Sequence, residues 1–225
     1  MTTYLELQDA VSAALQDPDN LTFDPPAIKA MIASAWADLS DMAPRRFQED
    51  IDPIADTTEY PILADDFPLG SDDITLMSVE IWDASEVPAT AYRQVQPASA
   101  HPMGLSYSQA GWRFWGGTLY IPDRVMDLIS VDDHIIRVWG YAPWPTLTLD
   151  ADVVPFGQIH EQALIIRCQI EAYRRLINNR VLFTQWQTRT NNTDVSPAFL
   201  MNEKAEASEE WRRRLRSIAV IREQP

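Results

Sequence analysis

The sequence is poor in the residues from which common active sites are built. Its 225 residues include one cysteine, three histidines and seven glycines. The single cysteine, Cys168, excludes an intrachain disulfide, and its place on an apolar helix face favours an inert packing role. The sequence contains no glycine-rich phosphate loop, nucleophile elbow or Cys-x-x-Cys pair. We therefore expect no catalytic residue, no metal site and no cofactor.

Positive charge is also scarce, and it is unevenly distributed. The chain has 18 Lys and Arg against 33 Asp and Glu, which gives a net charge of −15. Residues 1–160 hold 7 of the basic and 25 of the acidic residues, whereas residues 161–225 hold 11 and 8. An acidic body repels nucleic acid, while a basic C-terminal end can steer docking onto an acidic partner. A solubilising surface is the plainer explanation for any single charge.

Long apolar runs are missing as well. No run approaches the roughly 18 residues of a transmembrane helix. The first residues lack the basic and apolar regions of a secretory signal. We expect a protein that is made in the cytoplasm and has no membrane partner.

Two helices are expected in the first 46 residues. The first spans about residues 3–16. The second begins clearly, because Asp24 suits an N-cap and Pro25 suits the first helical position. Its apolar positions alternate by four and three residues, which predicts a buried stripe of Ile28, Ile32, Ala35, Leu39 and Met42, widened by Met31 and Trp36.

The strongest helical signal covers residues 157–178. One apolar stripe consists of Ile159, Ala163, Ile166, Ile170, Tyr173 and Ile177, and a second consists of Leu164, Cys168, Ala172 and Leu176. Two stripes exceed what one neighbouring element needs, so we expect the second stripe to contact a neighbouring subunit. For residues 180–188, the sequence is compatible with a continuation of this helix and with an extended arm.

A last helix begins at Ser196 and Pro197. It is acidic in its first half and basic near its end, in the run Trp211, Arg212, Arg213, Arg214, Leu215 and Arg216. Two explanations of this basic run have about equal weight. One is that its arginines complement the helix dipole near the C-terminal end. The other is that the run is a docking element, because arginine and tryptophan are typical of interaction hot spots. We take residues 196–225 as the candidate docking element.

The middle of the chain predicts short strands separated by turns. They fall at residues 57–63, 74–82, 89–95, 112–114, 118–121 and 134–141, with a helical turn or loop at 99–105. Gly116 and Gly117 predict a two-residue hairpin. Most tryptophans of this region are expected in a β core, whereas Trp112 and Trp115 adjoin the hairpin and are candidates for an exposed tip that binds a partner.

Three polar groups resemble known sites without meeting their requirements. His160-Glu161 lacks the second histidine of a zinc protease, because position 164 is a leucine. Residues 132–134 are consecutive, so a strand would point their side chains to opposite faces, and a solvated turn is favoured. The acidic pairs at 65–66 and 72–73 lack the spacing of a calcium loop and favour a charged turn.

Together these elements predict an α+β fold. Residues 1–46 and 151–225 are expected to form a helical bundle from the N- and C-terminal helices. Residues 47–150 are expected to form an inserted β-rich domain, built as a small antiparallel sheet or barrel.

The same layout resembles the head–tail adaptor proteins of tailed bacteriophages, also termed connector, head-completion or neck proteins. The likeness covers most of residues 24–220 and lies in the order of its motifs. A strand ending in Tyr and a Leu/Pro pair precedes an Asp-containing turn, and a short apolar strand is closed by Pro. Another strand ends in Tyr, and an acid–Pro–x–His–Glu junction leads into a long helix. These motifs match residues 57–67, 117–122, 138–143 and 150–161, with 74–82 as an intervening strand. The chain departs from shorter adaptors in its larger middle and its tryptophan content.

The resemblance implies a structural protein of the virion neck rather than an enzyme. Such adaptors form a homo-oligomeric ring, usually of twelve copies, beneath the portal protein. They extend the DNA channel, through which DNA passes without sequence-specific binding, and present a surface to a downstream neck or tail protein. Their C-terminal helix commonly engages the portal, which would assign that role to residues 196–225. Two other classes stay open: a non-enzymatic scaffold or regulatory protein acting as a monomer or dimer, and a small hydrolase that uses scattered carboxylates.

Overall fold

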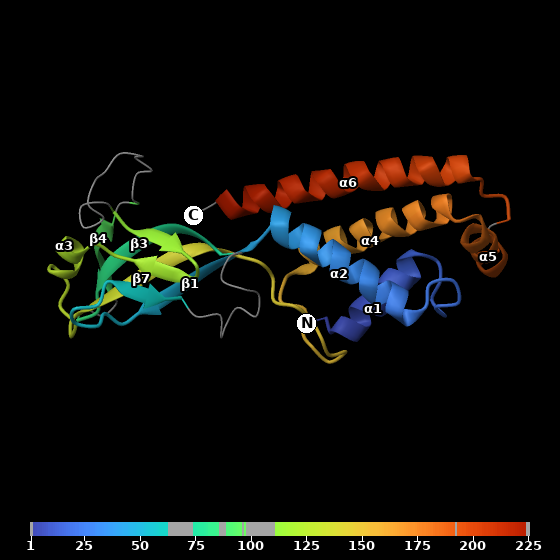
Figure 1. Cartoon of the computed structure of the whole chain (residues 1–225). Coiled ribbons are helices and arrows are strands. Elements are labelled where there is room, and N and C mark those ends of the chain that lie inside the picture. Colours follow the sequence, from blue (N-terminus) through green and yellow to red (C-terminus); the bar gives the residue numbers. More distant parts are fainter. Residues whose placement is uncertain are drawn as a thin grey trace. The chain divides into compact units, whose positions relative to one another are not determined.

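A computed structural model describes residues 2–62, 74–85, 89–95, 97, 111–191 and 193–223. It combines helices with antiparallel sheets, which places the chain in the α+β class. The chain divides into two compact units (Figure 1): a helical unit, Met1–Ala43 with Thr146–Pro225, and a β unit, Pro44–Pro145. The boundaries expected from the sequence, after residues 46 and 150, lie three and five residues further along the chain.

The first two helices of the helical unit begin where the sequence predicts. Helix α1 (Tyr4–Ala14) starts with a capping box formed by Thr3 and Glu6, and α2 (Pro25–Met42) starts with the Asp24 carboxylate accepting the N–H of Ala27 at 2.9 Å. These contacts satisfy backbone donors that a helix start leaves unpaired. Helix α2 buries its expected stripe except for Met42, its last residue, which is 60% exposed.

Helix α4 (Gln158–Asn178) packs against the other four helices of its own unit that the structure describes, α1, α2, α5 and α6. Arg167 pairs with Asp38 of α2 at 2.7 Å, and the Gln169 amide donates to the carbonyl of Ala14, the last residue of α1. Helix α6 (Pro197–Glu223) runs alongside α4 (Figure 1). The two are joined by a hydrogen bond from Arg214 to Gln162.

For residues 180–188 the sequence did not decide between a continued helix and an extended arm. In the structure this segment belongs to a separate helix, α5 (Arg180–Thr190). Asn179 caps it by accepting the N–H groups of Val181 and Leu182, each at 3.1 Å. Trp186 anchors the helix, since its indole N–H donates to the carbonyl of Leu15 at 3.2 Å. After α5 the chain turns, and α6 begins at the predicted Ser196 cap.

The β unit contains two antiparallel sheets. The larger has the order β1-β7-β3-β4, with β1 at Arg45–Ile51, β3 at Thr75–Asp83, β4 at Thr90–Val95 and β7 at His134–Ala142. The smaller has the order β2-β6-β5, with β2 at Glu59–Pro61, β5 at Arg113–Trp115 and β6 at Thr118–Tyr120. Gly116 and Gly117, with φ of +57° and +76°, form the predicted two-residue turn between β5 and β6.

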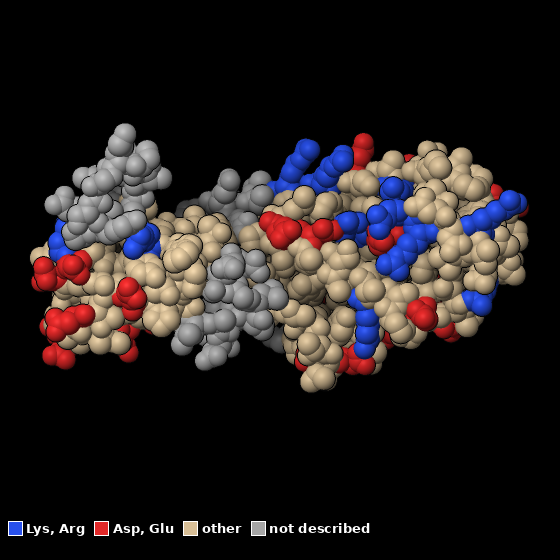
Figure 2. Space-filling model, in the orientation of Figure 1, with Lys and Arg blue, Asp and Glu red and all other residues tan. Residues whose placement is uncertain are grey.

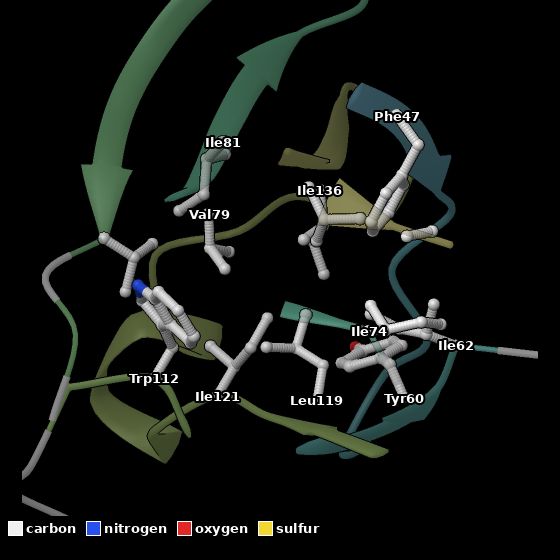
Figure 3. Packing of buried hydrophobic residues seen from close by; sticks show 13 residues of the cluster. Phe47, Tyr60, Ile62, Ile74, Val79, Ile81, Trp112, Leu119, Ile121 and Ile136 are labelled. Carbon is white, nitrogen blue, oxygen red and sulfur yellow. The ribbon is translucent and has the colours of Figure 1, made fainter. Parts of the chain in front are cut away.

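Side chains from both sheets meet in one apolar core (Figure 3). Val79, Ile81 and Ile136 of the larger sheet point toward residues of the smaller sheet and its flanks. Those opposing residues are Tyr60, Ile62, Trp112, Leu119 and Ile121. All of these side chains are less than 9% exposed, so this core holds the β unit together.

Two elements of the β unit were not predicted, β1 and the short helix α3 (Asp123–Met126). Among the described strands, β1 lies at an edge of its sheet and pairs with β7 alone, and Phe47 is its one buried residue. Six of its seven residues are at least partly exposed, so the apolar signal is weak. The acidic pairs at 65–66 and 72–73 and the segment at 99–105 lie outside the described residues.

Candidate functional site

The predicted subunit interface on α4 is wrong. Leu164, Cys168 and Ala172 have no exposed surface, and Leu176 is 2% exposed. These four side chains are covered within the helical unit, where α4 packs against α1, α2, α5 and α6. Burial also raises the pKa of the Cys168 thiol to about 12, which keeps it neutral and unreactive.

The C-terminal docking run divides between two sides of α6. The Arg167 guanidinium of α4 lies 5.7 Å from the centre of the Trp211 ring, and Leu215 is half-buried. Arg214 contacts Gln162 of α4 and pairs with Glu210 at 2.8 Å. Trp211, Arg214 and Leu215 therefore help to hold α6 in the helical unit, while their part in docking a partner stays a prediction.

The other three arginines of the run, Arg212, Arg213 and Arg216, are exposed. Figure 2 shows Lys and Arg side chains gathered over the helical unit. Arg213 pairs with Glu210, whereas no ion pair joins Arg212 or Arg216 to a carboxylate in the described part of the chain. The three line an open groove together with Glu206, Glu209 and Glu210.

The helix dipole does not account for this cluster. Helix α6 continues to Glu223, about two turns beyond Arg216. The favourable effect of the dipole on cations is confined to the last turn. Arg212 and Arg216 are therefore better candidates for a docking contact than for stabilising the helix end.

The two tryptophans predicted at the β tip have different environments. Trp112 is 7% exposed and belongs to the core of the β unit, so its assignment to an interface is wrong. Trp115, next to the Gly116–Gly117 turn, is 78% exposed. A large aromatic side chain at the end of a hairpin is typical of an interaction surface, and Trp115 stays a candidate.

The outer face of the larger sheet carries a surface that sequence reasoning missed. Trp82 and Trp139 are half-buried there, and both indole N–H groups donate to Glu80, at 2.8 and 3.3 Å. The guanidinium of Arg137 lies 4.0 Å from the centre of the Trp82 ring. The sequence could have indicated this surface, because Arg137 and Trp139 alternate along β7 with the apolar Ile136 and Val138, which are buried.

An ion pair on this face predicts a pH-dependent contribution to stability. Arg137 donates to both carboxylate oxygens of Asp50, at 2.6 and 2.7 Å, and these hydrogen bonds lower the pKa of Asp50 from its ordinary value of 3.8. A lowered folded-state pKa stabilises the fold above pH 3.8, and this stabilisation is lost as the pH falls through the lowered value. The effect is small, because the Asp50 side chain is 39% exposed.

We expect the thermal midpoint of the wild type to exceed that of Asp50→Asn at neutral pH. This difference should shrink as the pH falls below 3.8, the ordinary pKa of an aspartate side chain, and through the lowered pKa of Asp50. Melting curves recorded from pH 7 downward measure it. Asp52→Asn is the matched control, because it removes the same charge from an exposed side chain that forms no ion pair with a described residue, and it should leave the midpoint at neutral pH nearly unchanged. A gap for Asp50→Asn that does not change with pH would contradict the assignment.

The polar residues that resembled catalytic or metal sites contact other residues of the chain instead of one another. The His160 ring lies 5.7 Å from the Phe156 ring, and Glu161 accepts a hydrogen bond from Thr2. His134 Nδ1 accepts the N–H of Ser130 in the turn that enters β7. Among described residues, no group of three or more His, Cys, Asp or Glu is arranged to hold a metal ion. No described helix is long and apolar enough to cross a bilayer.

No protein-family model matches the sequence, and no curated protein matches it.

Proposed function

We propose that this chain is a structural head–tail adaptor of a tailed bacteriophage. In this role, copies of the chain form a ring, twelve in the family that it resembles, beneath the portal protein. The ring extends the DNA channel and offers an attachment surface to the tail. The observation that carries the proposal is the exposed arginine cluster of α6, Arg212, Arg213 and Arg216, on the helix that would engage the portal.

The order of elements supports this proposal. Helices from both ends of the chain belong to one unit, and the antiparallel sheets between them form another. This arrangement fits a helical bundle with an inserted β domain, the layout on which the resemblance rests. Trp115 at the hairpin of the β unit would serve as the contact for a downstream neck or tail protein.

The charge of the chain fits a channel component. The β unit holds 16 Asp and Glu against 6 Lys and Arg. Acidic walls let DNA pass without adhering to them, because like charges repel its phosphates. The basic residues lie mainly beyond residue 160, where they can meet an acidic partner.

Mass measurement of the purified chain, alone and mixed with its portal, tests the proposal. Twelve copies of the 25.6 kDa chain have a mass of about 307 kDa, well separated from a monomer. We expect a ring on the portal, while the free chain can stay monomeric because each copy carries a charge of −15. A chain that stays monomeric or dimeric with portal present would instead favour a scaffold or regulatory protein.

A further inference from the structure

Helix α5 exposes a face that has positive charge and no negative charge. Residues 180–190 contain two arginines and no Asp or Glu, in a chain whose net charge is −15. The outward side of this helix forms an open groove lined by Arg180, Val181, Thr184, Gln185, Thr188 and Arg189. We call these six residues the α5 face. Val181 is 68% exposed and adds apolar surface to this face.

Contacts within the helical unit do not account for this charge. Arg180 lies in the first turn of α5, where the helix dipole disfavours a cation. The described residues provide no ion pair for Arg180 or Arg189. The next acidic residue along the chain is Asp194, in the turn before α6. The α5 face therefore fits a partner that supplies negative charge together with apolar side chains.

The β unit has a surface with this composition. Between residues 123 and 133, the side chains of Asp123, Asp127, Asp132 and Asp133 are exposed, and Arg124 is the only Lys or Arg. Leu128 and Val131 of the same segment are 49% and 47% exposed. We call residues 123–133 the acidic tip. Figure 2 shows acidic side chains at the end of the β unit where Figure 1 labels α3.

We propose that the acidic tip of one copy docks on the α5 face of a second copy. Leu128 and Val131 would pack on Val181 and the neighbouring threonine methyl groups, while the tip aspartates face Arg180 and Arg189. Burial of the apolar side chains would supply affinity, and the opposed charges would set register and exclude other partners.

This contact would link copies in a repeating order. Each copy carries both surfaces, so the contact is heterologous and can close into a ring. The inference rests on the proposed function only in taking the assembly to be a closed ring. The complementary charges and apolar side chains themselves are properties of this chain.

Disulfide trapping between two full-length variants tests the contact. One carries Val181→Cys and the other Leu128→Cys, so a mixed disulfide can form only between chains. The native Cys168 is fully buried and does not compete. We expect a mixed dimer of about 51 kDa, twice the 25.6 kDa of one chain, on a non-reducing gel. Its yield should be several-fold higher than with Met77→Cys, a control in the β unit outside the tip that is 54% exposed.

Charge reversal then tests whether these two surfaces recognise each other. Arg180→Glu with Arg189→Glu in the first variant, or Asp127→Lys with Asp132→Lys in the second, should abolish the mixed dimer. Combining both reversed proteins should restore it, which a merely misfolded variant would not do. Raised salt should weaken the native pair, because exposed charges are screened. Trapping no better than the Met77→Cys control, or no rescue by the combined reversals, would overturn the inference.

The outcome is separable from that of the portal experiment. A ring on the portal without trapping between these cysteines would leave the adaptor function standing and move the subunit contact elsewhere. Trapping and rescue in a chain that never binds a portal would leave the contact standing and remove the adaptor function.

Discussion

A chain carrying Arg212→Glu and Arg216→Glu is expected to keep its fold and lose binding to the portal. Both side chains are exposed on α6 and have no recorded ion pair within the described residues. Reversing them removes attraction to an acidic partner and adds repulsion. Two interface hot spots lost together correspond to an affinity reduced roughly 100-fold or more. Titration of portal with each variant, followed by calorimetry or by mass, measures the change.

The structure determines which arginines should be changed and which control is appropriate. Arg214 contacts Gln162 and Glu210, so reversing it would disturb the packing of α6 on α4 and confuse the result. Arg93→Glu with Arg113→Glu alters the net charge by the same amount at exposed positions of the β unit, outside the acidic tip. This control should bind the portal nearly as well as the wild type. Equal loss in both variants would show a non-specific charge effect, and unchanged binding in both would move the portal contact away from α6.

Helix starts could be predicted from the sequence because their causes are local. Asp24 followed by Pro25, and Ser196 followed by Pro197, determine backbone geometry and hydrogen bonds within a few residues. Strand β1 could not be found in this way. Its pairing with β7 joins residues about ninety positions apart, and its exposed side leaves little apolar pattern.

The errors at the candidate site have a common origin. Apolar periodicity in α4 indicated a wide buried surface, but it could not distinguish a helix of the same chain from a neighbouring subunit, and Leu164 is covered by the former. Likewise, composition alone could not show which arginines of α6 contact the helical unit and which are exposed. Helical spacing could have helped, since Glu210 precedes Arg213 and Arg214 by three and four residues, where side chains meet.

The largest effect on stability is expected from Gly140→Ala in β7. Gly140 pairs with Phe47 of β1 and Leu76 of β3, and it faces the core of the β unit. An added Cβ would lie 2.5 Å from the carbonyl oxygen of Thr75 and 2.7 Å from Cε1 of Phe47. The first neighbour is backbone in the adjacent strand, so relief requires the sheet to shift. We expect the free energy of unfolding of the β unit to fall by about 3 kcal/mol, as for other overpacked cores.

Chemical denaturation followed by tryptophan fluorescence measures this loss. Gly157→Ala is the matched control, since a Cβ there meets nothing within 4 Å and should cost less than about 1 kcal/mol. Adding Phe47→Leu to Gly140→Ala should recover only part of the stability, because it relieves the contact with the ring and not the contact with Thr75. A Gly140→Ala chain as stable as the wild type would mean that β3 and β7 can separate at little cost. Full recovery by Phe47→Leu would identify the aromatic ring, rather than the backbone of β3, as the reason that position 140 requires glycine.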